Sequence, residues 1–346
     1  MAINANFFSS KELAVGVGID NSNVGTVGTS FTGIEVDSVS FPTFNDVKIE
    51  RRSGSGSGIM TATTDMFHWG KGATIEGSIS GYMTDELMAI FISNVTGVAE
   101  SSDSWTVDGT DTENFKFEHN DSSPLSTKTL TFIYNGVGSS TDDCVKIPGC
   151  VVTSLTLSAD PNEDGGRMKF DASWISRTPI AIASTYTASP ASAAIGTNYC
   201  YLGDYGYGGG GIKVNNTDVL LKSFSLTIDN PVIFGGFGGN STDGAPQMYI
   251  RSIPEMSITV NPVLKYDANV AALWEDLRGS GDGVQAETLA SPAFEMTSAA
   301  SSANRTISIT DGTVTEMSWD EGDYLGASVT IKARGDNATS FYFKQA

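Results

Sequence analysis

Alternation of apolar and polar residues, the period of a half-buried β-strand, recurs along most of the chain. Residues 224–229, FSLTID, show it plainly. The same alternation predicts strands at 38–41, 47–50, 75–79, 129–134, 152–157, 168–174, 256–260, 314–319 and 327–333. The turn-forming run 160–166, DPNEDGG, joins two of these strands into a predicted β-hairpin. The pattern therefore predicts a mainly β fold.

Two segments carry the helical period instead. The first opens at Thr84 or Asp85 as its N-cap and ends before Gly97. Its apolar positions are Leu87, Met88, Phe91, Ile92 and Val95. The second opens at Asp267 and ends before Gly279. Its apolar positions follow the i, i+3, i+4, i+7 spacing at Val270, Leu273, Trp274 and Leu277.

The order of elements is the same in both halves of the chain. In each half a strand leads into a Gly-rich segment, 51–58 or 235–239, and further strands, a helix and a closing hairpin follow. Because 346 residues exceed the usual size of one hydrophobic core, we predict two tandem copies of one unit. The expected unit is a β-sandwich or barrel (α+β) with one short helix per repeat and long hairpin loops. The boundaries are a first domain with an N-terminal arm at 1–184, a linker at 185–198 and a second domain at 199–346.

Composition supports a folded and turn-rich protein, with 40% hydrophobic residues, 17% charged residues and 38 Gly. Asp and Glu number 40 against 20 Lys and Arg, a formal net charge of −20. Such an excess argues against a grip on phosphate backbones. The first residues lack a basic segment followed by an apolar run, and no run approaches the ~18 apolar residues of a membrane helix. We therefore expect synthesis in a cytosol and no membrane anchor.

Candidate chemistry is sparse. Asp160, Asn162, Asp164 and Asp171 follow the spacing of a calcium loop, but predicted strands flank them and the same residues suit a hairpin turn, which we favour. Gly206–Gly211 matches G-x-G-x-x-G by letter, yet no helix is predicted after it, so a nucleotide site is not expected. The acidic pairs Asp142-Asp143 and Glu275-Asp276 are interpreted as solvated surface.

The remaining reactive side chains form no motif. Cys144, Cys150 and Cys200 lack metal-site spacing and are expected to be reduced packing residues. His68 and His119 lie in no recognisable triad context. We expect no catalytic residue, no metal and no cofactor, and the chain is not expected to be an enzyme.

Several stretches together resemble the tail tube proteins of long-tailed bacteriophages (siphophages), in particular those with a duplicated tube domain. The segment from Lys11 to Gly28 resembles the N-terminal arm of that family and leads into a first strand at 34–39. Residues 147–157, with their hairpin and Trp174, are also similar. The order of strands, long hairpin loop, strands, helix and strands extends the resemblance over most of both halves.

This resemblance implies a structural virion protein of the viral tail that polymerises as stacked rings into a tube for genome passage. It implies homotrimeric rings with pseudo-sixfold symmetry, built in the host cytoplasm. It further implies tape measure, terminator and distal tail proteins as partners, and DNA only in passage. The long loops would then contact neighbouring subunits or rings through Arg51, Arg52, Ser53, Gly54, Gly56, Gly58, Gly236, Phe237 and Gly238. The acidic composition could keep a lumen from retaining DNA, or could serve ordinary solubility.

The alternative is a β-sandwich binding module, such as a phage fibre, an adhesin or a carbohydrate-binding protein. In that case exposed aromatic side chains would stack on sugars, with Trp69, Trp105 and Tyr205 as candidates.

Overall fold

The computed structural model describes residues 13–20, 31–40, 43–50, 67–96, 113–116, 129–136, 144–176, 181–182, 198–206, 211–234, 249–251, 255–263, 275, 277, 289–298, 305–321, 325–333 and 341–345. Strands dominate this part of the chain, and their pairing is antiparallel throughout the main sheet. The predicted mainly β fold is confirmed.

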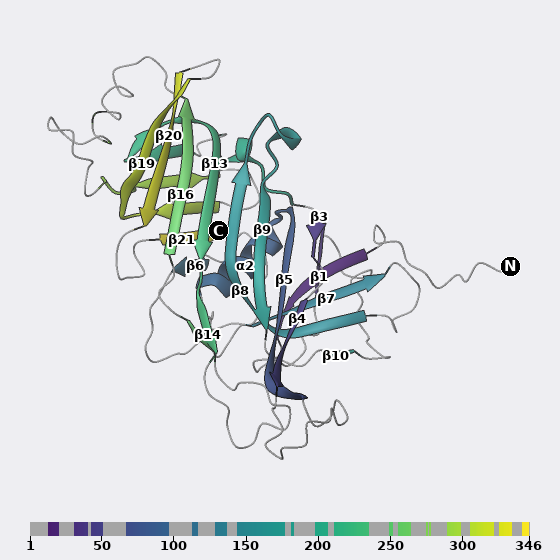
Figure 1. Cartoon of the computed structure of the whole chain (residues 1–346). Helices are drawn as coiled ribbons and strands as arrows, with labels where there is room; N and C mark the ends of the chain where they lie inside the picture. Colours follow the sequence, from purple (N-terminus) through teal and green to yellow (C-terminus); the bar gives the residue numbers. More distant parts are fainter. Residues whose placement is uncertain are drawn as a thin grey trace.

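One long sheet, here called the main sheet, runs through both halves of the chain (Figure 1). Its strand order is β3 and β4, then β5, β9, β8, β13, β16, β20 and β19. The bounds are β3 Val36–Val39, β4 Thr43–Glu50, β5 Phe67–Tyr82, β9 Lys169–Ser176, β8 Cys144–Ala159, β13 Leu220–Asp229, β16 Glu255–Val263, β20 Leu325–Ala333 and β19 Gly312–Glu321.

Other elements cover one face of the main sheet. Behind its first half lie the helix α2 (Asp85–Thr96) and strands that continue from the start of β8: β10 (Ala181–Ile182), β7 (Leu130–Gly136), β1 (Leu13–Ile19) and β2 (Thr32–Ile34). Behind its second half lies a sheet of β12 (Thr217–Asp218), β11 (Gly211–Val214), β17 (Phe294–Thr297), β18 (Arg305–Ile309), β21 (Phe341–Gln345) and β6 (Glu113–Lys116). The remaining elements are β14 (Val232–Phe234), β15 (Tyr249–Arg251), and the 3-10 helices η3 (Asp164–Gly166) and η5 (Leu202–Gly206).

The apolar side chains of the strands meet between these layers in one continuous core. Trp174 is its largest buried side chain, and its ring stacks on Phe132 with centroids 5.0 Å apart. Phe91 brings α2 into the same core, 5.0 Å from the ring of Phe170. The helix begins as the sequence predicts, because the Thr84 Oγ1 atom accepts the backbone N–H of Leu87 at 3.4 Å.

The main sheet consists of two four-strand sets with the same internal order. The first set runs β3/β4, β5, β9, β8, and the second runs β13, β16, β20, β19. Each closing hairpin has a β-bulge at the same place, at Thr153 in β8 and at Thr315 in β19. Both threonine hydroxyls donate to a carbonyl of the next strand, Thr153 to Ser173 at 3.2 Å and Thr315 to Thr330 at 3.3 Å.

A second bulge also recurs, in the opening strand of each set. In β3 it lies at Asp37, between Val36 and Ser38. In β13 it lies at Lys222, between Leu221 and Ser223. Since a bulge changes the local twist and the side chains' direction, two shared bulges indicate that the backbones of both sets follow the same course.

The strand predicted at 34–39 is interrupted at Glu35: Ile34 ends β2, which pairs with β1, whereas Val36–Val39 form β3, which pairs with β5. The predicted arm contains a core strand, since β1 lies between β2 and β7 with Val17 buried. Of the second predicted helix, only Glu275 and Leu277 are described, both helical, and Leu277 is buried.

The hairpin predicted around 160–166 is confirmed, with Ser158 paired to Lys169 and Leu157 to Phe170. The alternation at 129–134 gives a strand, but both of its faces are buried. Thr129 and Thr131 are tolerated there because their hydroxyls donate to the buried carboxylate of Asp20, which also accepts the backbone N–H of Gly149 at 2.9 Å.

Candidate functional site

The uncovered face of the main sheet is lined mainly by small hydroxyl side chains. They are the polar partners in the alternation that buries the core, so they repeat across neighbouring strands. Thr156 lies beside Thr227 with their hydroxyls 3.2 Å apart, and Thr259 lies beside Thr330 at 3.0 Å. The hydroxyl-bearing positions of this polar face include Ser78, Ser80, Ser154, Thr156, Ser158, Ser173, Ser225, Thr227, Ser257, Thr259, Ser328 and Thr330.

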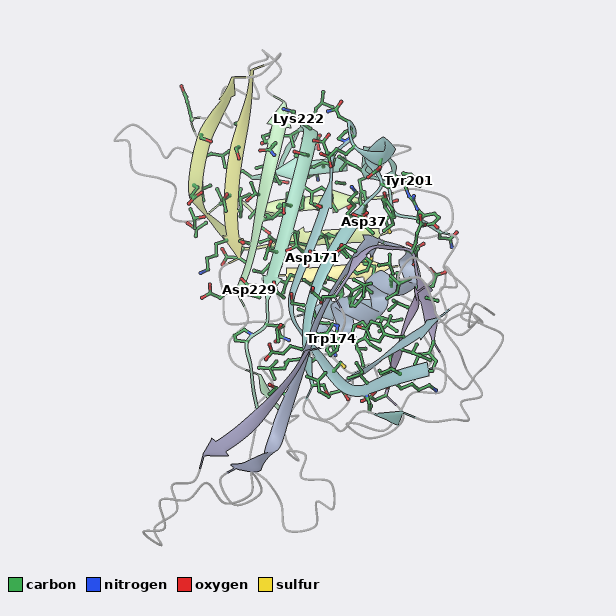
Figure 2. The ribbon with its side chains drawn as sticks, turned by 45° about the vertical axis from the view of Figure 1, so that its right-hand side comes forward. Asp37, Asp171, Trp174, Tyr201, Lys222 and Asp229 are labelled. Carbon is green, nitrogen blue, oxygen red and sulfur yellow. The ribbon has the colours of Figure 1, made fainter. Side chains whose placement is uncertain are left out.

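Charged groups on the polar face are mainly acidic, and two of its lysines are paired with carboxylates. Figure 2 labels Asp171 on β9 and Asp229 on β13, and the Asp229 carboxylate accepts the hydroxyl of Ser154 at 3.0 Å. The Lys332 ammonium lies 2.7 Å from Glu255, and that of Lys169 lies 2.6 Å from Asp164. The face therefore has a net acidic character, with these two ammonium groups already neutralised.

The main sheet ends in strands that lack a second partner. Among the described residues, β19 pairs only with β20 at one end, and β3 and β4 pair only with β5 at the other. Unpaired N–H and C=O groups at such edges are ready to bind another strand. The internal contact between β8 and β13 joins the same two kinds of strand, the last of one set and the first of the next.

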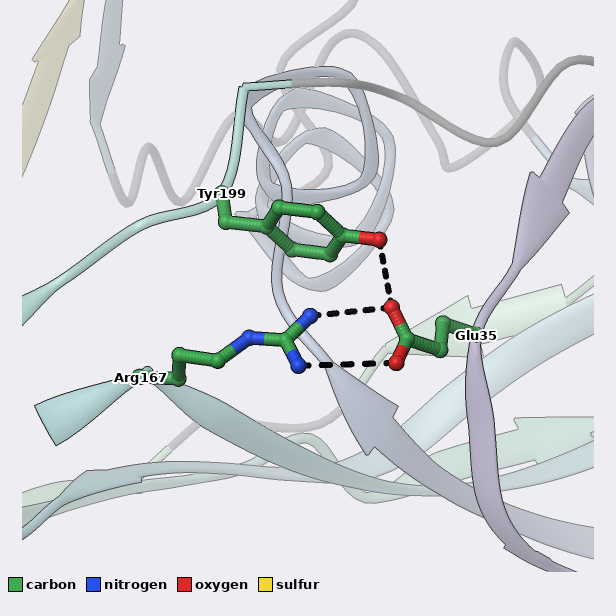
Figure 3. A network of polar contacts seen from close by, with 3 residues as sticks. All are labelled: Glu35, Arg167 and Tyr199. Atoms are coloured by element: carbon green, nitrogen blue, oxygen red, sulfur yellow. Dashed lines mark hydrogen bonds and ion pairs between the residues drawn. The ribbon is translucent and has the colours of Figure 1, made fainter. Parts of the chain in front are cut away.

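A polar cluster fixes the chain where it enters the open edge strand β3 (Figure 3). Arg167 donates to both carboxylate oxygens of Glu35, at 3.4 and 2.9 Å. Its guanidinium lies between two aromatic rings, 3.9 Å from the centroid of Tyr82 and 4.0 Å from that of Tyr199. The Tyr199 hydroxyl donates to the same carboxylate. These donors, Arg167 first, hold the pKa of Glu35 below its usual value.

The cluster also anchors residues 198–201 to the first half of the chain. The backbone N–H of Cys200 donates to Met83 at 3.1 Å, and that of Met168 donates to Cys200 at 2.8 Å. Isolated bridges join Tyr199 to Thr84 and Tyr201 to Arg167. Residues 199–201, directly after the predicted linker, are therefore bound to the first half.

Asp160, Asn162 and Asp164, which have calcium-loop spacing, lie in the hairpin turn that the sequence favours. The carboxylate of Asp160 accepts the N–H of Asn162 at 2.8 Å, while that of Asp164 is bound to Lys169. Asp171 is exposed on β9, and these acids do not gather into a group of three able to hold a metal. The same holds for all His, Cys, Asp and Glu of the described residues.

The predicted loop contacts lie outside the described residues, at Arg51, Arg52, Ser53, Gly54, Gly56, Gly58, Gly236, Phe237 and Gly238. So do Trp105, His119, Asp142, Asp143 and Asp276. The expected exposure of Tyr205 is wrong, since its side chain is fully buried. Cys150 and Cys200 are buried and reduced, as predicted. Gly211 begins the strand β11 and no helix, which agrees with the interpretation of the Gly-rich run.

Sequence reasoning missed the cluster of Glu35, Arg167 and Tyr199. Its members are separated by 132 and 164 positions, and each alone is an ordinary surface residue type. The alternation around Glu35 gave a continuous strand, so the change of sheet that exposes its carboxylate to Arg167 left no local signal. No helix in the described residues is long and apolar enough to cross a membrane.

Comparison with known proteins adds the family. No curated protein matches the chain. The model of the phage tail tube protein family matches residues 10–333, nearly the whole chain, and we conclude that this chain belongs to the phage tail tube protein family.

Proposed function

We propose that the chain polymerises as stacked rings into the tail tube and that this tube conducts the genome during infection. Its family makes it a structural component of the virion tail. The observation that carries the finer proposal is the β8–β13 contact, in which the last strand of one four-strand set pairs with the first strand of the next. The open strands β19 and β3 repeat those two roles at the ends of the sheet. A head-to-tail contact of this kind closes into a ring when the rotation permits.

The shared order and the shared bulges support a duplicated tube domain, with domains at 1–184 and 199–346 and a linker at 185–198. Each chain would then supply two of six similar units, so that three copies make a pseudo-sixfold ring. Residues 198–201 would belong spatially to the first unit, because their hydrogen bonds go there.

The polar face of the main sheet is the surface we assign to the lumen. Its hydroxyl groups bond to one another across strands, and Lys169 and Lys332 are held by carboxylates. A duplex passing such a surface would meet few cations able to release counterions from its phosphates. DNA would be in passage only. The role calls for no catalysis and no cofactor.

Tape measure, terminator and distal tail proteins are the partners we propose, with assembly in the host cytoplasm. The long loops at 51–58 and 235–245 would contact neighbouring subunits or rings. The binding-module alternative has less support, since Tyr205, one of its three candidate sugar-stacking residues, is buried.

Electron microscopy of the purified full-length chain tests the proposal. We expect rings or tubes whose rotational averages show six similar densities built by three chains. A strictly monomeric species in every assembly condition would overturn it. A glycan array run on the same preparation separates the alternative, because specific glycan binding by monomers would favour a binding module.

A further inference from the structure

The internal contact between β8 and β13 provides a template for the contact between copies. In it Phe224 pairs with Ala159 and Ile228 with Leu155. The two four-strand sets can be aligned by their bulges, Asp37 on Lys222 and Thr315 on Thr153. In this alignment Val39 is equivalent to Phe224, and Glu321 is equivalent to Ala159. A neighbour that continued the sheet in this register would set its Glu321 opposite Val39 and its Asp320 opposite Ser40.

The two contacts differ in charge at one end. In the internal contact the bulge carries Lys222, and β8 ends in Ser158 and Ala159 before Asp160. In the contact between copies the bulge carries Asp37, and β19 ends in Asp320 and Glu321. The internal contact thus brings Lys222 toward one acid, Asp160. The contact between copies brings Asp37 toward two acids, Asp320 and Glu321, and Asp323 follows them in the sequence.

Two cations near the open edge, in the part of the chain that the structure describes, are engaged elsewhere. The pKa of Lys169 is raised mainly by its bond to Asp164 and to a smaller degree by Asp37, and its ammonium lies 2.6 Å from Asp164. Arg167 is bound to Glu35 and stacked between Tyr82 and Tyr199. Asp37 itself is exposed on the open strand.

We propose that adjoining copies pair β19 with β3 in the register of the internal contact, and that the acidic residues on both sides oppose this pairing until they are screened. The proposal rests on the proposed tube function and adds its contact surface and a barrier to spontaneous assembly. Like charges across neighbouring strands are destabilising, and dissolved salt weakens them over a screening length of about 10 Å at 0.1 M. The internal contact needs no such barrier because one chain carries both strands.

Disulfide trapping tests the register. Ser40→Cys and Asp320→Cys in one chain lie at opposite ends of the main sheet, seven strand spacings of about 4.8 Å apart, so they cannot bridge within a chain. Under oxidation at assembly conditions we expect covalent oligomers on a non-reducing gel. The matched control Ser40→Cys with Thr313→Cys shifts the second cysteine along β19 and should give monomers. Equal trapping by both pairs, or trapping by the control alone, overturns the register.

A charge reversal tests the barrier. Asp37→Lys makes the open bulge resemble the one at Lys222, and we expect assembly at about tenfold lower protein concentration in low salt, with weaker dependence on NaCl. Asp218→Lys makes the same net change on exposed β12 of the covering sheet and serves as control. Light scattering over a NaCl series, with thermal melts of the monomers, measures both. If Asp37→Lys does not fold, Asp37→Asn takes its place with a smaller expected shift.

The outcomes separate the two proposals. If wild-type chains never form rings or tubes in any salt, the proposed function itself fails. If wild-type chains assemble, but Asp37→Lys matches wild type or Asp218→Lys lowers the threshold as much, the charge barrier fails and the function stands.

Discussion

The two four-strand sets of the main sheet share their polar face and bulges, yet they fill the core behind them differently. In the first set Gly77 pairs with Trp174, and a Cβ atom on Gly77 would lie 2.4 Å from the indole. At the equivalent place in the second set Ile258 pairs with Ile331. The first set thus fills this part of the core with one large side chain and a glycine, whereas the second set fills it with two side chains of medium size. The contrast shows that two different residue pairs can fill equivalent core positions, because the total volume of the pair matters more than the identity of each residue.

Of the substitutions considered, Trp174→Ala should lower the stability of the chain most. Trp174 is almost completely buried against Phe132, and its truncation leaves a cavity in the first set that the short Gly77 cannot fill. We expect a loss of ~3–5 kcal/mol in the free energy of unfolding. Urea denaturation measures it, with far-UV circular dichroism of the backbone as the signal in place of tryptophan fluorescence.

The control introduces the residue pair of the second set at the equivalent positions of the first set. Trp174→Ile alone leaves space beside Gly77, whereas Gly77→Ile with Trp174→Ile recreates the pair found at Ile258 and Ile331. The double variant should be more stable than Trp174→Ile alone. A double variant less stable than the single one would contradict the exchange of volumes.

Glu35→Gln should weaken the polar cluster of Glu35, Arg167 and Tyr199, which lies beside the open edge strand β3 of the first set. The Glu35 side chain is 37% exposed, so the charge-assisted bonds are discounted to about 1 kcal/mol at neutral pH. Because the pKa of Glu35 is lowered from 4.5 in the folded chain, this stabilisation is present above pH 4.5 and is lost as the pH falls through the lower folded pKa.

Thermal melts of wild type and Glu35→Gln between neutral pH and pH 3 should therefore converge on the acidic side. Glu255→Gln, which removes the partner of Lys332 on the polar face, is the matched control and should shift stability by less than about 0.5 kcal/mol. A constant gap between wild type and Glu35→Gln at every pH would argue against an ionised clamp.

The smallest expected changes in stability are those at the two bulge threonines, Thr153 and Thr315. Thr153→Val and Thr315→Val each remove one hydroxyl bonded to a carbonyl of the next strand while keeping the β-branched shape. We expect each to lose about 1 kcal/mol, equal within about 0.5 kcal/mol. Denaturant midpoints measured on both variants check it. A large effect at one bulge and none at the other would show that the bulges are not equivalent.

Much of the fold was accessible from local patterns. The alternation predicted the strands and the hairpin at 160–166, and the capping residue Thr84 predicted the start of α2, because each signal depends on neighbours within a few positions. The family resemblance was also predicted, from element order, and the match over residues 10–333 confirmed it.

The sequence by itself thus determined the mainly β class, the acidic character and the element order, since these are sums over local choices. Tertiary structure alone decided that the chain turns between sheets at Glu35, that β8 joins β13, and that Arg167 meets Glu35 from 132 residues away. The physical reason is that strand pairing and ion pairing link residues that are distant in the chain. Local periodicity fixes which face of a strand is buried, but it does not specify which partner its edges will find.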